Sequence, residues 1–181
     1  MVSNAITIFR TLLTLPLFVL LAFGGNAWAA LALFLGAGAL DMVDGKVARA
    51  RSETSAFGAM IDLVGDRLLT FAAVTGLIAG GVITGVVALA GLILIVRDLI
   101  VASLNEALPG KLGPRVGLVE KIKIAAAFAS IGLLIVAPAL SGDVGAGIFQ
   151  AGEIVLGIAA GLTLVTLVQS WMRALRAFRE N

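Results

Sequence analysis

Long apolar stretches, separated by short polar or glycine-rich connections, make up most of the chain. Six spans of roughly 20 residues would use about two thirds of it, because a helix of that length crosses the hydrocarbon core of a bilayer. Glycine, asparagine and clustered charges mark the connections as turns. The pattern predicts an all-α integral membrane bundle of six transmembrane helices, with apolar stretches at 11–23, 27–40, 58–80, 82–104, 118–140 and 148–171.

Two connections are distinctly polar, and one helix is expected to continue beyond its apolar stretch. The stretch that ends at Leu40 meets Asp41 without a turn residue, so this helix should continue through the charges that follow. The first convincing loop is 50–57, and the longest polar connection is 105–117.

Composition supports a membrane protein. Of the 181 residues, 60% are apolar and 13% are charged, and the mean hydropathy is +1.11. Soluble domains usually carry about 25% charged residues. A separate soluble domain has no room, so residues 1–181 are expected to form a single transmembrane domain. Because the chain has no cysteine and no histidine, acid–base or metal chemistry must use carboxylates.

The distribution of basic residues predicts the orientation. They gather around the second and fourth connections and after the last span, whereas the first, third and fifth connections contain none. By the positive-inside rule, both termini are then cytoplasmic. Arg173, Arg176 and Arg179 form one basic helical face suited to anionic headgroups. That face explains the pI near 9.5 without a nucleic acid partner.

Four aspartates form the candidate chemical site. Asp41 and Asp44 are three residues apart, and Asp62 and Asp66 are four apart, so each pair shares a helical face. A short loop joins the two helices, so the four carboxylates can converge. They would repel one another unless cations compensate them. Oxygen ligands favour Mg²⁺ or Mn²⁺, with Ca²⁺ possible, and two ions roughly 3.5–4 Å apart would suit displacement at phosphorus.

A structural alternative is that the aspartates are helix-terminal charges facing water, balanced by Lys46, Arg49, Arg51 and Arg67. Two converging pairs favour a metal site instead. Small residues nearby also open room between the helices, namely Gly45, Ala48, Gly58 and Ala59.

The segment from Asp41 to Asp66 resembles the signature D-x-x-D-G-x-x-A-R-x8-G-x-x-x-D-x-x-x-D of the CDP-alcohol phosphotransferases. All eight fixed positions and every spacing agree. The resemblance implies an integral membrane enzyme in which an alcohol displaces CMP from a CDP-linked donor.

The resemblance also implies roles for individual residues. Asp41, Asp44 and Asp62 are expected to bind metal, and Asp66 to bind metal and act as the general base for the acceptor hydroxyl. The expected contacts to the donor nucleotide are Asp44, Gly45, Ala48, Arg49 and Gly58.

A second similarity is to the phosphatidylglycerophosphate synthase branch. It is carried by the N-x-x-T-x-x-R segment from Asn4 to Arg10, by Arg97-Asp98, and by Lys121-Ile-Lys123. Glu120 replaces a glycine of that branch, Ile124 replaces a threonine, and Leu63-Val64-Gly65 stands where a proline is usual. The branch implies CDP-diacylglycerol as donor, glycerol 3-phosphate as acceptor, and Asn4 and Thr7 at the donor site.

A basic pocket for a phosphorylated acceptor is expected from Arg97, Arg115, Lys121 and Lys123. The alternative is that Arg97 pairs locally with Asp98 or Asp66, while the lysines enforce topology and reach headgroups. Phosphatidylglycerol or inositol phosphate stay open as acceptors.

Two other functional classes fit parts of the sequence. A divalent-cation transporter would place carboxylates in the membrane, but it predicts polar groups through the depth of several spans. A structural subunit explains the glycine-rich spans but not four aspartates.

The family resemblance implies a homodimer, and the sequence suits a bacterial inner membrane with the active site facing the cytoplasm. Some glycines suit internal or dimer contacts alike, namely Gly76, Gly80, Gly85 and Gly91.

Overall fold

The computed structural model describes residues 2–50, 56–108 and 117–179, without the side chains of residues 2–7, 41–50, 56–64 and 66. All the secondary structure in these ranges is helical, as the sequence predicts. The elements are α1 (Val2–Ala22), α2 (Ala27–Ala50), α3 (Ala56–Ala79), α4 (Gly85–Ala107), α5 (Leu118–Val136), the 3-10 helix η1 (Ala137–Ala139) and α6 (Gly142–Arg179).

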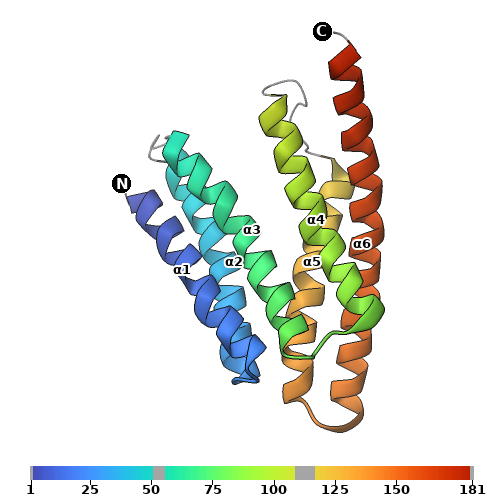
Figure 1. The fold of residues 1–181 in the computed structure, drawn as a ribbon. Helices are drawn as coiled ribbons and strands as arrows, with labels where there is room; N and C mark the ends of the chain where they lie inside the picture. Colours follow the sequence, from blue (N-terminus) through green and yellow to red (C-terminus); the bar gives the residue numbers. More distant parts are fainter. Residues whose placement is uncertain (1, 51–55, 109–116, 180–181) are drawn as a thin grey trace.

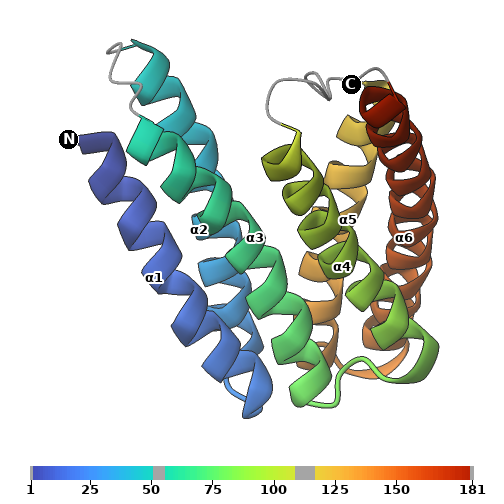
Figure 2. The same ribbon diagram turned by 45° about the horizontal axis from the view of Figure 1, so that its top comes forward.

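The helices form one elongated bundle with two sides (Figures 1 and 2). Helices α1, α2 and α3 make one side, and α4, α5 and α6 make the other. Packing of α3 on α4 and of α2 on α5 joins the two sides. Both ends of the chain lie at one end of the bundle, together with the C-terminal ends of α2 and α4 and the first turns of α3 and α5. We call this the terminal end, and the opposite one the turn end.

The helix boundaries confirm most of the predicted pattern. Helix α2 continues through the charged residues as far as Ala50. Helix α1 includes Pro16 without ending there, which neighbouring helices and local adjustments allow in apolar bundles. Helix α6 begins at Gly142, before the expected position 148, and it continues through the basic residues to Arg179.

Three helical segments of the described chain are long and apolar enough to cross a membrane: Gly85–Ala107, Leu118–Ala139 and Gly142–Arg179. The described apolar parts of the first three helices are shorter, at Ile8–Ala22, Ala27–Leu40 and Arg67–Ala79. Six spans therefore stay a prediction for the first three helices. Because α6 has 38 residues, it is about 57 Å long at the usual helical rise, well beyond the thickness of a hydrocarbon core.

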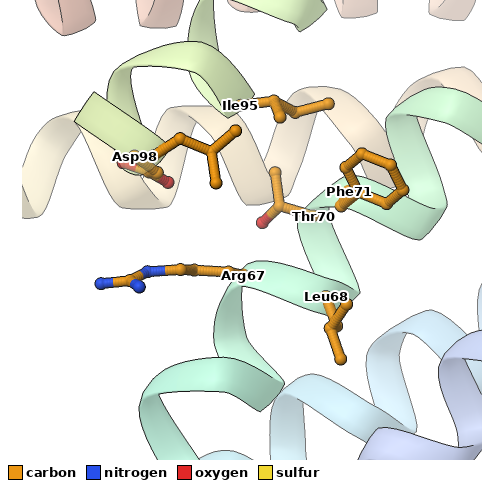
Figure 3. Close-up of a pocket in the computed structure, with 7 residues that line it drawn as sticks. Arg67, Leu68, Thr70, Phe71, Ile95 and Asp98 are labelled. Carbon is orange, nitrogen blue, oxygen red and sulfur yellow. The ribbon is translucent and has the colours of Figure 1, made fainter. Parts of the chain in front are cut away.

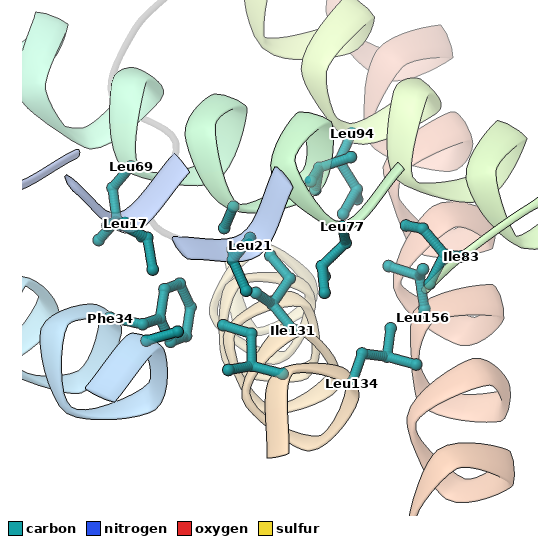
Figure 4. Packing of buried hydrophobic residues seen from close by; sticks show 14 of the residues in the cluster. Leu17, Leu21, Phe34, Leu69, Leu77, Ile83, Leu94, Ile131, Leu134 and Leu156 are labelled. Carbon is teal, nitrogen blue, oxygen red and sulfur yellow. The ribbon is translucent and has the colours of Figure 1, made fainter. Parts of the chain in front are cut away.

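The core is a continuous set of apolar side chains between the two sides of the bundle (Figure 4). Leu17 and Leu21 of α1 and Phe34 of α2 meet Leu77 of α3 and Ile131 of α5 there. The outer surface is also apolar. It exposes large side chains from several helices, including Leu12, Leu15, Val86, Ile154 and Val168, which a bilayer would cover.

Glycines allow the helices to approach closely. A Cβ atom on Gly76 would lie 2.8 Å from Leu21 Cβ, and one on Gly80 would clash with the Leu21 carbonyl oxygen. A Cβ atom on Gly91 would lie 2.7 Å from Cγ1 of Val74. These three glycines therefore serve internal contacts, which the sequence left undecided. Gly85 differs, since it has a φ of +53° and open space around it.

Hydroxyl groups buried in the apolar helices bond to carbonyls of their own helix. Ser130 Oγ donates to the Ala127 oxygen, and Thr163 Oγ1 donates to the Ala159 oxygen. Thr166 and Ser170 make similar bonds within α6. These bonds satisfy the hydroxyl groups locally, so they do not by themselves indicate a polar site.

We expect Gly80→Ala to lower the stability of the protein. The new methyl group would meet the backbone of α1, which cannot rotate away, and overpacking of this kind costs typically 1–3 kcal/mol. The thermal unfolding midpoint in detergent measures the effect. Gly161→Ala is the matched control, because nothing lies within 4 Å of its new Cβ atom. Equal midpoints for the two variants would contradict the close approach of α1 and α3.

Candidate functional site

The signature segment lies on two neighbouring helices at the terminal end. Helix α2 carries Asp41 and Asp44, and α3 carries Asp62 and Asp66. Both helix segments lie at the same end of the bundle (Figure 2). The side chains of these aspartates are outside the described residues, as are those of Asn4, Thr7, Gly45, Ala48, Arg49 and Gly58. The metal and nucleotide contacts therefore stay predictions.

Arg10 of α1 lies against this segment. Its side chain is buried, with 1% of the residue exposed. A Cβ atom on Gly65 would lie 2.7 Å from Arg10 Nη2 and 3.0 Å from Thr11 Oγ1. Gly65 therefore leaves the space that the guanidinium occupies, in the stretch of α3 between Asp62 and Asp66.

Arg10 was not among the site residues predicted from the sequence, although it ends the N-x-x-T-x-x-R segment. The available signal was its position at the start of an apolar stretch. An arginine within a membrane span is costly unless it has a partner, so it marks a functional position by default.

A second group of charged residues joins α4 and α5, and we call it the charge cluster: Arg97, Asp98, Glu120 and Lys123. Arg97 Nη1 donates to Asp98 Oδ1 at 2.9 Å, and Arg97 Nη2 donates to Glu120 Oε1 and Oε2 at 3.0 and 3.1 Å. Lys123 Nζ donates to Glu120 Oε1 at 2.9 Å and lies 3.9 Å from Asp98 Oδ1. The cations are the buried members, with side chains 4% and 7% exposed, whereas Glu120 is 15% and Asp98 35% exposed.

Two cavities of about 100 Å³ each adjoin the charge cluster. One lies between α3 and α4, where Arg67, Thr70 and Asp98 border it (Figure 3). The second cavity is bordered by Asp98 and Lys123, by mostly apolar residues of α2, α3, α4 and α5, and by Thr163 of α6. Asp98 and Thr70 line both cavities, so the cluster is next to space that can hold several water molecules.

The structure brings together part of the predicted acceptor pocket. Arg97 and Lys123 meet although 26 positions separate them in the sequence. Lys121 lies on the exposed face of α5, and Arg115 is outside the described residues. The local pairing of Arg97 with Asp98 is also present. The sequence prediction missed Glu120 as a partner of both cations. The feature that could have indicated it is that Glu120 stands where the branch pattern has a glycine.

A metal site is not tested by the described side chains. No group of three or more acidic, histidine or cysteine residues lies close enough to hold an ion among them. The side chains of the four signature aspartates are outside the described residues, so their metal binding stays a prediction.

Comparisons with known proteins agree with the signature. Residues 1–172 match the family described as CDP-alcohol phosphatidyltransferase. A protein of Escherichia coli (strain K12) is 30% identical over 97% of this chain and 95% of its own length. A protein of Rickettsia typhi is 30% identical over 90% of each chain. Both relatives are named CDP-diacylglycerol–glycerol-3-phosphate 3-phosphatidyltransferase.

We expect Arg97 and Glu120 to be energetically coupled. Arg97→Met would leave two carboxylates facing one ammonium group, and Glu120→Gln would relieve part of that imbalance in the double variant. Residues joined in one ion-pair network show interaction energies of roughly 0.5–3 kcal/mol. Unfolding of the wild type, both single variants and the double variant in detergent measures this energy. Strictly additive effects would contradict a shared network.

Proposed function

Since the chain belongs to the CDP-alcohol phosphatidyltransferase family, we propose that it transfers a phosphatidyl group from CDP-diacylglycerol to glycerol 3-phosphate and releases CMP. The family match over residues 1–172 carries this proposal. The names of relatives that share almost the whole length of the chain support this donor and this acceptor. The product would be phosphatidylglycerophosphate, so the reaction belongs to phospholipid biosynthesis.

The carboxylate groups of the signature are suitable ligands for a hard divalent cation. Four carboxylates on neighbouring helix segments, in a chain without histidine or cysteine, suit Mg²⁺ or Mn²⁺. We propose that Asp41, Asp44, Asp62 and Asp66 are the ligands of two such ions. When bound, the ions neutralise the diphosphate of the donor and stabilise the departing CMP.

The protein's own groups would orient both substrates and move one proton. Asp66 takes the proton of the acceptor hydroxyl as that oxygen attacks the phosphorus bound to diacylglycerol. The bond from this phosphorus to the CMP oxygen breaks, and CMP leaves with the bonding electrons. The proposed contacts to the donor nucleotide are Asn4, Thr7, Asp44, Gly45, Ala48, Arg49 and Gly58.

The charge cluster is the proposed acceptor side of the site. Arg97 and Lys123 are two buried cations within reach of one oxygen atom, an arrangement that suits the phosphate of glycerol 3-phosphate. Arg115 and Lys121 are proposed to add positive charge around the entrance. Other phosphorylated acceptors, such as inositol phosphate, share this chemistry, and phosphatidylglycerol supplies a phosphodiester instead.

The proposed topology has six spans with both termini and the active site on the cytoplasmic side of a bacterial inner membrane. It is supported by the position of both chain ends at the terminal end of the bundle and by the basic residues of that end. The length of α6 would carry Arg173, Arg176 and Arg179 beyond the hydrocarbon core. A homodimer, as the family resemblance implies, is part of the same proposal.

A transporter finds no specific support in the described part of the chain. The buried charged residues there are Arg10, Arg97 and Lys123, and all three occur in the halves of their helices nearer the terminal end. A permeation path for cations would need charged groups in the halves nearer the turn end as well.

The direct test is CMP release by the purified protein with CDP-diacylglycerol and Mg²⁺ or Mn²⁺. We expect glycerol 3-phosphate to stimulate release more than inositol 1-phosphate, inositol, serine or phosphatidylglycerol do. Chelation of the metal should abolish release. Stimulation by a different acceptor would move the chain to another branch of the family, and no release from folded protein with any acceptor would contradict the proposed reaction.

We expect Asp66→Asn to separate binding from turnover. An amide cannot accept the hydroxyl proton, and loss of a general base lowers the rate typically 10²–10⁴-fold. Binding of CDP-diacylglycerol should change little. Initial rates of CMP release and equilibrium binding of the donor measure the two effects. Asp143→Asn, at the exposed start of α6, is the control, and near-normal turnover of Asp66→Asn would remove its role as base.

A further inference from the structure

The carboxylate of Glu120 occupies the point between the two buried cations. Its Oε1 atom lies 3.0 Å from Arg97 Nη2 and 2.9 Å from Lys123 Nζ. Asp98 is placed differently, since its Oδ1 atom contacts Arg97 at 2.9 Å but lies 3.9 Å from Lys123. Glu120 therefore holds the position in which an oxygen of an incoming anion would interact with both cations.

The charge cluster has no net charge in this arrangement. Arg97 and Lys123 contribute two positive charges, and Asp98 and Glu120 contribute two negative charges. A neutral group of this kind attracts a dianion weakly, and the carboxylate oxygens would repel it at short distance. A phosphate could use both cations only if one carboxylate gave up its position.

Glu120 is the carboxylate that can give up its position. It lies in the first turn of α5, where Gly117 is the N-cap, and its side chain is not fully buried, although it is less exposed than that of Asp98. The positive end of the helix dipole also stabilises a carboxylate there without the cations. Asp98, by contrast, is adjacent to Arg97 in the chain and bonds to its other terminal nitrogen.

Arg97 also has a donor that the two carboxylates leave unused. Its Nε atom is buried and has no hydrogen-bond partner in the described part of the chain. A buried donor without a partner is energetically unfavourable. A phosphate offers three acceptor oxygens where a carboxylate offers two, so it has one more with which to reach such a donor.

We propose that the Glu120 carboxylate occupies the binding position of the acceptor phosphate until the acceptor displaces it. This exchange then sets the selectivity for acceptors. Binding of the acceptor exchanges the carboxylate for the phosphate on Arg97 and Lys123, and Glu120 turns toward solvent at the start of α5. A dianionic phosphate with three oxygens can drive this exchange, whereas an acceptor hydroxyl without a phosphate cannot. This inference rests on the proposed function, because it assigns a phosphorylated acceptor to the charge cluster.

The test compares binding of glycerol 3-phosphate to the wild type and to Glu120→Gln. The amide keeps the shape of the side chain but removes its charge, so the cluster gains a net positive charge. We expect the dissociation constant for glycerol 3-phosphate to fall about fivefold or more, the lower end of ordinary coupling between two sites. The dissociation constant for CDP-diacylglycerol should stay the same. Calorimetry on the full-length protein in detergent measures both constants.

Glu106→Gln is the matched control, because Glu106 lies exposed near the C-terminal end of α4. It removes a carboxylate near the same end of the bundle without a contact to either cation, so its affinity for glycerol 3-phosphate should equal that of the wild type. A similar gain in both variants would indicate a general field effect and would overturn the specific role of Glu120.

Other outcomes also decide whether the acceptor displaces Glu120. An unchanged or weaker affinity in folded Glu120→Gln would make Glu120 a structural partner of the cations and overturn the proposal. If Glu120→Gln does not fold, Glu120→Asp supplies the second test. Its shorter carboxylate cannot bridge both cations, so we expect an affinity above that of the wild type, and failure of both variants to fold would overturn the proposal.

Failure of the proposed function would give a different experimental result. In that case the wild type would release no CMP with any acceptor, whatever the binding measurements show. Tighter binding of glycerol 3-phosphate by Glu120→Gln would still establish the exchange at the cluster. Absence of binding in both proteins would overturn the exchange even if CMP release occurred with another acceptor.

Discussion

Neutralisation of buried cations is the constraint on which the polar half of this bundle depends. Burial of a guanidinium or ammonium group in an apolar interior is costly unless acceptors such as carboxylates lie within a few ångströms. Glu120 and Asp98 meet this requirement for Arg97 and Lys123, and in doing so they tie α4 to α5. Because the pairing uses every one of these charges, it stabilises the cluster and at the same time opposes the entry of another anion.

Close packing on glycine connects this polar half to the rest of the fold. Gly76 and Gly80 bring α3 against Leu21 of α1 at the turn end. Nearer the terminal end, Gly65 allows the same close approach of α3 to α1. There the side chain that lies against the glycine is that of Arg10 and not an aliphatic one. One helix contact therefore has two uses. It packs the core, and it holds a buried guanidinium against the stretch of α3 between Asp62 and Asp66.

The charge cluster gives the departures of the sequence from the branch pattern a structural meaning. Glu120 stands where the branch has glycine, and this added carboxylate is the group that bridges the two cations. Ile124, which stands in place of a threonine, borders the second cavity, which Lys123 also lines. These two of the three departures therefore lie on the proposed acceptor side of the site, whereas all eight fixed positions of the signature are retained.

The sequence by itself determined the helices, the candidate metal ligands and the family. Apolar stretches and the periodicity of a helix are local properties, so the shared face of Asp41 and Asp44 follows from their spacing alone. Tertiary structure decided which helices meet. Only the packing of both α4 and α5 on α6 could bring Arg97 to Glu120, and only packing of α1 on α3 could bury Arg10 beside Gly65. Sequence spacing does not reveal such contacts, because glycine and charge patterns permit several neighbours and the complementary surfaces of the folded helices select one.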